Sequence, residues 1–116
     1  VHHQNKKDSP SGTALTTADR ILKAHQGKTS IVTEKLDRRP EQNELHVASV
    51  RGGTIPGIHT VLIDSTADTI ELRHSARNRT GFAHGAVLAA EWLQKKSGVY
   101  TIDNFITSII GEGENA

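Results

Sequence analysis

Residues 58–75, IHTVLIDSTADTIELRHS, contain the clearest structural signal in this chain. Residues 58–64 form an apolar run, and residues 69–75 alternate between apolar and polar side chains. Alternation with a period of two is typical of a β-strand with two different faces. Residues 65–68, STAD, are turn-forming residues that separate the two runs. The stretch therefore predicts an antiparallel hairpin.

The rest of the chain predicts further helices and strands around this hairpin. In residues 12–26, apolar and small side chains recur at three- and four-residue spacing, which is typical of a helix with one buried face. Further helices are predicted over residues 80–96 and 100–110, and strands over residues 30–33 and 45–50. We therefore expect an α+β domain with a mixed β-sheet of about four strands, helices on one face, and a sheet used for oligomerisation.

The composition predicts a thin core and excludes some classes of function. The 116 residues fit one domain, but only 34% are hydrophobic and 3% aromatic. We expect apolar surface to be covered by something outside the chain. A net charge of +1, with no long basic run, argues against nucleic-acid binding and against a polybasic membrane patch.

The ends and the cysteine count give expectations about location. The chain has no cysteine, which favours a reducing cytoplasm, and no apolar run approaches the roughly 20 residues of a membrane span. The N-terminus is polar from its second residue and is no signal peptide. Because the chain does not begin with methionine, we expect an N-terminal part to be missing. The sequence contains neither a G-x-G-x-x-G nor a G-x-x-x-x-G-K-[ST] fingerprint, and the histidines lack zinc-ligand spacing.

The densest group of polar residues is HHQNKKDSPSGT, residues 2–13. Two histidines can transfer protons near neutral pH, and a lysine adds positive charge. A helix that begins here leaves backbone N–H groups unpaired, which favours an anion. The sequence thus predicts a carboxylate or phosphate pocket with an acid beside it. The candidate residues are His2, His3, Lys6, Ser11, Gly12 and Thr13.

Each feature also has an ordinary structural explanation. Ser11 can serve only as a helix cap, and the histidines and Lys6 can be solvated surface residues. A second polar cluster, residues 49–53 with His59, is interpreted from sequence as a strand end followed by a flexible loop. The residue pattern by itself leaves the existence of an anion site open.

Three segments resemble the dihydrodipicolinate reductase family and together cover nearly the whole chain. Residues 2–14 are similar to the family signature H-H-x-x-K-x-D-x-P-S-G-T-A, which is highly specific. SVRGG at 49–53, followed by GIHTV at 57–61, resembles a second family stretch, and so does ELRHSA leading to FAHGA. The departures are small: Ser9 stands where the family often has Ala, and His84 where it often has Asn.

The resemblance implies a domain and a reaction. Residues 1–116 would be the C-terminal substrate-binding and tetramerisation domain, with an N-terminal Rossmann-like domain binding NADH or NADPH. The implied reaction reduces 4-hydroxy-tetrahydrodipicolinate, a small dicarboxylate, in lysine and diaminopimelate biosynthesis. By motif position, the implied roles are His2 as proton donor and acceptor, Lys6 as second proton donor, His3 as substrate contact, and Ser11, Gly12 and Thr13 as carboxylate ligands.

Two other functions remain open at this stage. The short core and the missing cofactor half favour an isolated anion-binding oligomerisation module without catalysis. The third possibility is an acid–base lyase or hydrolase that uses His2 and Lys6 without any nicotinamide. The family resemblance also implies a homotetramer formed through the sheet.

Overall fold

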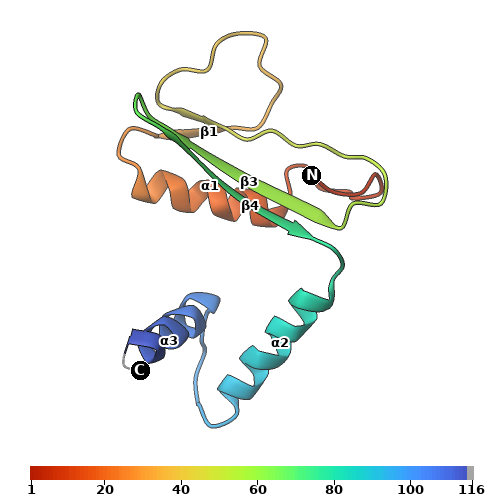
Figure 1. Ribbon diagram of the computed structural model, residues 1–116, viewed down its shortest axis with the longest axis vertical. Helices are drawn as coiled ribbons and strands as arrows, with labels where there is room; N and C mark the ends of the chain where they lie inside the picture. The colour runs from red at the N-terminus through yellow and green to blue at the C-terminus, as the bar shows by residue number, and fades with distance from the viewer. Residues whose placement is uncertain (115–116) are drawn as a thin grey trace. The chain divides into compact units, whose positions relative to one another are not determined.

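The structure, a computed structural model, describes residues 1–114. The chain divides into two compact units, Val1–Arg77 and Asn78–Ala116, which are described separately. The first unit holds one helix and four strands: α1 (Gly12–Ala24), β1 (Ser30–Val32), β2 (Glu44–His46), β3 (Gly57–Asp64) and β4 (Thr69–Ala76) (Figure 1). The second holds α2 (Thr80–Leu93) and α3 (Ile102–Glu114).

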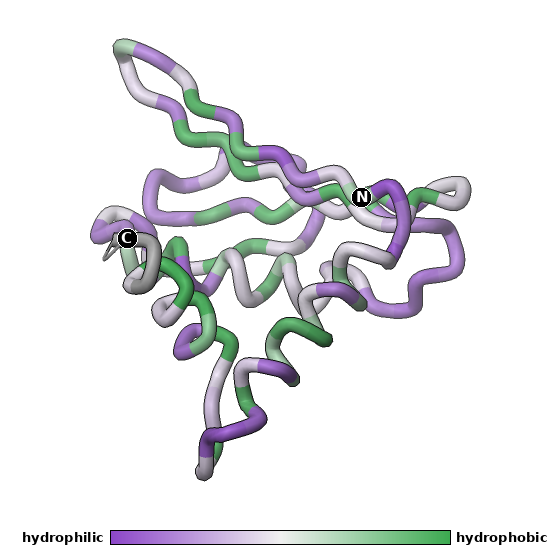
Figure 2. Tube along the Cα trace, turned by 60° about the horizontal axis from the view of Figure 1, so that its bottom comes forward, coloured by the Kyte–Doolittle hydropathy of each residue, from purple (hydrophilic) through white to green (hydrophobic). Residues whose placement is uncertain are grey.

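The hairpin expected from sequence is confirmed. Strands β3 and β4 are antiparallel, with Gly57 opposite Ala76 at one end and Asp64 opposite Thr69 at the other. At the turn, Ser65 N donates to the Asp68 carbonyl at 2.9 Å, and the Ser65 hydroxyl oxygen accepts from the backbone N–H of Asp68 at 3.1 Å. Figure 2 shows apolar and polar residues alternating along the hairpin.

The α+β class with mixed pairing is confirmed, but the four strands form two pairs and not one continuous sheet. Strands β1 and β2 are parallel neighbours, and β3 and β4 form the second pair. The strand expected over residues 45–50 is divided, because only its first part pairs with β1. After Val47, which still donates to the Val32 carbonyl, the chain turns to other partners.

Helix α1 begins where the sequence predicts. The Ser11 side chain caps it by accepting a hydrogen bond from Ala14 N at 3.1 Å, and Ser11 itself is only 5% exposed. Ala18 is buried at 2% exposure on the inner face of the helix. The helix ends at Ala24, two residues earlier than expected.

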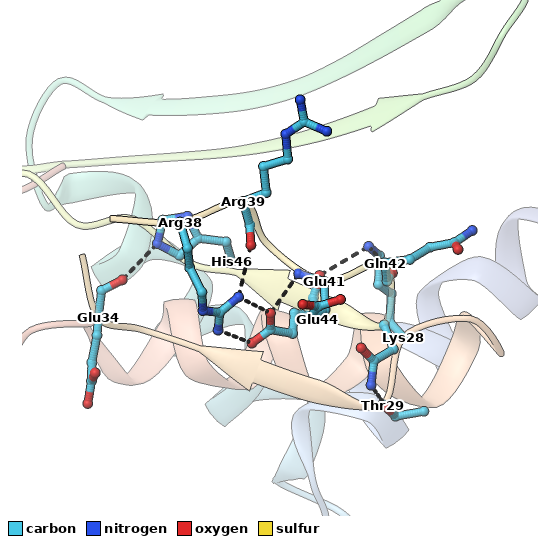
Figure 3. A network of polar contacts seen from close by, with 10 residues as sticks. Lys28, Thr29, Glu34, Arg38, Arg39, Glu41, Gln42, Glu44 and His46 are labelled. Atoms are coloured by element: carbon cyan, nitrogen blue, oxygen red, sulfur yellow. Dashed lines mark hydrogen bonds and ion pairs between the residues drawn. The ribbon is translucent and has the colours of Figure 1, made fainter. Parts of the chain in front are cut away.

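The segment that joins β1 to β2 is held by a network of charged and polar contacts (Figure 3). Arg38 donates from both terminal nitrogens to the two carboxylate oxygens of Glu44, at 2.8 and 2.9 Å. Glu41 N donates to the same carboxylate at 2.7 Å, and Lys28 Nζ donates to the carbonyls of Gln42 and Glu44. A bidentate arginine–carboxylate pair fixes direction as well as distance, so this loop has a defined path.

The second unit is organised around Trp92. The indole packs edge-on against Tyr100 and at a tilt against Phe105, with ring centroids 5.3 and 5.5 Å away. Its N–H donates to the Ser108 hydroxyl at 3.1 Å, which joins α2 to α3.

Helix α3 is capped by Thr101, whose Oγ1 accepts from Asn104 N at 3.3 Å. The helix continues to Glu114, past residue 110, where the sequence pattern predicts its end; residues 115–116 lie outside the described part. Within the described residues, no helix is both long and apolar enough to cross a membrane.

The Arg38–Glu44 pair predicts an acid-sensitive loop. Hydrogen bonding to Arg38, followed by that to the Glu41 backbone, lowers the pKa of Glu44 from 4.5 to about 2. A lowered folded-state pKa contributes stability that is present above 4.5 and lost as the pH falls towards 2. Glu44→Gln should therefore lower the free energy of unfolding at neutral pH. The free energy of unfolding of this variant should also change less as the pH falls towards 2.

Denaturant unfolding measured across that pH range would check the prediction. Glu34→Gln is the matched control, since Glu34 contributes its carbonyl, and not its carboxylate, to the network. If Glu44→Gln lost stability in acid as steeply as wild type, the Arg38–Glu44 pair would not be the cause of the acid sensitivity.

Candidate functional site

The N-terminal segment is held on two sides by backbone hydrogen bonds. On one side, Val1 N donates to the carbonyl of Ile58 in β3 at 2.7 Å, and Ile58 N donates to the Val1 carbonyl at 2.8 Å. On the other, His2 N donates to the Val50 carbonyl at 3.1 Å, and the His2 carbonyl accepts from Gly52 N at 3.0 Å. Figure 1 shows the N-terminus beside β3 and the start of α1. The two polar clusters of the sequence therefore lie together.

His2 is held against β3 by its neighbours. Its ring meets the His59 ring edge-on, with centroids 5.1 Å apart and planes at 71°. A Cβ atom on the buried Gly57 would lie 3.3 Å from His2 Nε2, so the ring rests on a backbone position where glycine leaves room. Burial first, and then nearby positive charges including Lys6 and Arg51, lower the pKa of His2. Once protonated, this imidazole is a stronger acid than an ordinary histidine.

The start of α1 presents backbone donors as the sequence predicts. Ser11 accepts from Ala14 N through its side chain and from Leu15 N through its carbonyl. Thr13 N has no acceptor among the described residues. A Cβ atom built on Gly12 would meet nothing within 4 Å, so a ligand can approach the backbone here.

Lys6 lies at the same helix start and forms an ion pair with Asp8 at 2.9 Å. Its side chain is 24% exposed, so it is not the freely solvated lysine of the ordinary explanation. The hydrogen bond from Lys6, followed by backbone hydrogen bonds of Asp8 and Gly12, lowers the pKa of Asp8. One carboxylate is therefore already stabilised at the helix start, where cation and dipole act together.

Arg51 belongs to this cluster, contrary to the interpretation of residues 49–53 as a flexible loop. It forms a parallel β-bridge with His2. Its guanidinium donates to the carbonyls of Asp8 and Val50, at 2.8 and 3.0 Å. Its Nε atom is buried without a hydrogen-bond partner in the described structure.

His59 is the second residue that sequence reasoning missed. Its Nε2 atom lies 3.3 Å from the Ser11 hydroxyl oxygen, across 48 residues of sequence. Burial first, then positive charges including His74, lower the pKa of His59. Two sequence signals point to it: its place in the second polar cluster, and its place in the GIHTV segment of the family resemblance.

The remaining candidate, His3, is half-buried next to this cluster, and its carbonyl accepts from Lys6 N at 3.3 Å. Among the described residues, no group of three or more histidine, cysteine, aspartate or glutamate side chains could hold a metal ion. The site therefore consists of imidazoles, cations and helix donors.

Fold and site together define a class of small α+β domains in which acid–base and cationic side chains gather at a helix start. The family described as "Dihydrodipicolinate reductase, C-terminus" matches residues 1–106. Because the match covers most of the chain, the chain belongs to this family.

Individual relatives agree with this family. The chain is 46% identical over 107 residues to the 4-hydroxy-tetrahydrodipicolinate reductase of Methanosarcina acetivorans, covering 91% of this chain and 40% of that protein. For the enzyme of the same name from Archaeoglobus fulgidus, identity is 43% over 111 residues, covering 91% of this chain and 43% of that protein. The dipicolinate-bound dihydrodipicolinate reductase from Paenisporosarcina sp. TG-14 superposes with a TM-score of 0.66 at 26% identity. The match covers 89% of this chain and 41% of that protein. The chain thus spans less than half the length of these relatives.

Proposed function

We propose that this chain is the substrate-binding half of a 4-hydroxy-tetrahydrodipicolinate reductase of lysine and diaminopimelate biosynthesis. The observation that carries the proposal is that the His2 ring contacts His59, which reaches Ser11 at the start of α1, in a chain of this family. Lys6 pairs with Asp8 in the same segment. The relative from Paenisporosarcina was solved with dipicolinate bound, which supports a dicarboxylate ligand.

In this proposal, the helix start binds one substrate carboxylate. Thr13 N donates a hydrogen bond, and Gly12 leaves space for the approach. Ser11 supplies its hydroxyl, and Lys6 supplies a charge that compensates the desolvation of the carboxylate. His3, which lies in the same segment, contacts the substrate.

His2 and Lys6 exchange protons with the substrate during reduction. An imidazolium with a lowered pKa holds its proton less tightly than that of an ordinary histidine and releases it readily, as a general acid must. The ion pair with Asp8 holds Lys6 beside this imidazole cluster and provides a second donor. Together they place proton sources beside the bound dicarboxylate.

The described residues do not fit a dinucleotide. Helix α1 follows an irregular segment and not a strand, and the sequence contains no G-x-G-x-x-G. We therefore assign NADH or NADPH to an N-terminal domain outside this chain, and residues 1–116 to the C-terminal substrate-binding and tetramerisation domain.

The proposal predicts a specific pattern of kinetics in the full-length protein. It should turn over 4-hydroxy-tetrahydrodipicolinate only when NADH or NADPH is present. His2→Gln and Lys6→Ala should each lower kcat by about 10²–10⁴-fold, because each removes a proton donor, and should change cofactor affinity little. Stopped-flow or steady-state absorbance of the nicotinamide measures both quantities.

Matched controls are available in the chain. Lys7→Ala removes an exposed neighbouring lysine, and His46→Gln removes a histidine of the Figure 3 network. Both should retain the wild-type kcat. Wild-type kcat in His2→Gln and Lys6→Ala would show that the roles are wrong, and turnover without nicotinamide would support a lyase or hydrolase instead.

We also propose that the domain forms a homotetramer through the β3–β4 hairpin. Leu62, Ile63, Ile70 and Leu72 are between 49 and 68% exposed. Burying such side chains is favourable by roughly 25 cal/mol per Å² of apolar area, and a symmetric copy provides the matching surface. Ile63 and Ile70 are directly opposite each other and, with Leu72, lie on one face of the hairpin, whereas Leu62 lies on the other. Ile63 and Ile70 are near the turn, four residues along β3 from His59, so an interface there leaves the site free.

This proposal predicts that Ile70→Asp dissociates the tetramer. The substitution places an uncompensated charge in the apolar interface, which is strongly unfavourable. Light scattering after size exclusion of the full-length protein should give four subunits for wild type and fewer for the variant. Thr66→Asp, at the exposed hairpin turn, is the control and should remain tetrameric. A monomeric wild-type protein would contradict the proposal.

A further inference from the structure

The Ser11 hydroxyl is the buried polar group around which the site is arranged. Ser11 is a polar residue and is buried, with 5% of its surface exposed. Two groups approach its oxygen: Ala14 N at 3.1 Å and His59 Nε2 at 3.3 Å. The first is a helix-cap hydrogen bond, and the second joins α1 to β3. Ala14 N can only donate, whereas His59 Nε2 donates or accepts depending on the tautomer.

A hydroxyl has one proton and two lone pairs, so its partners determine where the proton points. When His59 Nε2 carries a proton, it and Ala14 N together use both lone pairs of Ser11. The Ser11 proton is then available to a third group. When Nε2 is bare, Ser11 donates to the imidazole and turns a lone pair outward. A lone pair repels a carboxylate, whereas a proton binds it.

We propose that His59 is a positioning residue whose Nε2–H donates to Ser11 and directs the Ser11 hydroxyl proton to the substrate carboxylate. The inference rests on the proposed function, because it assumes that a carboxylate binds at the start of α1. It goes further in assigning His59 a task, and in making Ser11 a hydrogen-bond donor to the ligand as well as a helix cap.

The surroundings of His59 suit this task. Strand β3 fixes its backbone, and the edge-on contact with His2 restricts its ring. Its pKa is lowered, so the ring is neutral near pH 7 and both tautomers are accessible. Ligand binding can therefore select the Nε2–H tautomer without taking up a proton.

A double-mutant cycle in the full-length protein tests the inference, with pyridine-2,6-dicarboxylate as the probe and calorimetry as the measurement. Ser11→Ala and His59→Leu should each weaken binding about 10-fold, the effect of one hydrogen bond to a charged group. The double variant should bind no more weakly than Ser11→Ala, because His59 acts only through Ser11. His59→Gln should restore affinity, since its amide can donate to Ser11. Thr60→Val, on the opposite face of β3, is the control and should bind as wild type does.

Imidazole ¹⁵N NMR of the wild-type protein gives a readout that does not depend on the variants folding. With pyridine-2,6-dicarboxylate bound, His59 Nε2 should carry the proton. A bare Nε2 in the complex, or additive effects in the cycle, would overturn the role of His59 while leaving the proposed function intact. A wild-type protein that does not bind the probe would overturn the proposed function and this inference together.

Discussion

The backbone pairing of residues 1–4 is the constraint on which the site depends. This short segment is hydrogen-bonded to β3 through Ile58 and to the loop through Val50 and Gly52. Backbone N–H and C=O groups must be hydrogen-bonded when they leave water, so the bonds to β3 and to the loop select one position for the segment. That position brings His2 against His59 and sets the distance from His2 to the start of α1. Main-chain bonds thus place the backbone of His2, and the ion pair with Asp8 holds the side chain of Lys6.

Electrostatics explains why such a site suits an anion. Lys6, Arg51 and the donors of α1 all present positive charge, and the Asp8 carboxylate, paired with Lys6, balances part of it. The same positive field lowers the pKa of both imidazoles, after the larger effect of burial. In the proposed function, a dicarboxylate that enters this field is stabilised by the cations and raises the tendency of the imidazoles to hold protons. The proposal therefore couples binding and proton transfer through charge.

Local features of the chain were predictable from sequence, and long-range pairing was not. The Ser11 cap, the Thr101 cap and the β3–β4 turn depend on residues within four positions of one another. The division of residues 45–50 between two partners depends on contacts with Val32 and His2, which no periodicity encodes. For the same reason the residue pattern alone favours an ordinary loop and strand end at Arg51 and His59. Only the fold brings them to the helix start.

A structure of the full-length protein with pyridine-2,6-dicarboxylate tests the central claim most directly. The account predicts one carboxylate within hydrogen-bonding distance of Thr13 N and the Ser11 hydroxyl, with Lys6 beside it and His2 near the ring. A dicarboxylate bound elsewhere on the protein, with the start of α1 left to water, would contradict it.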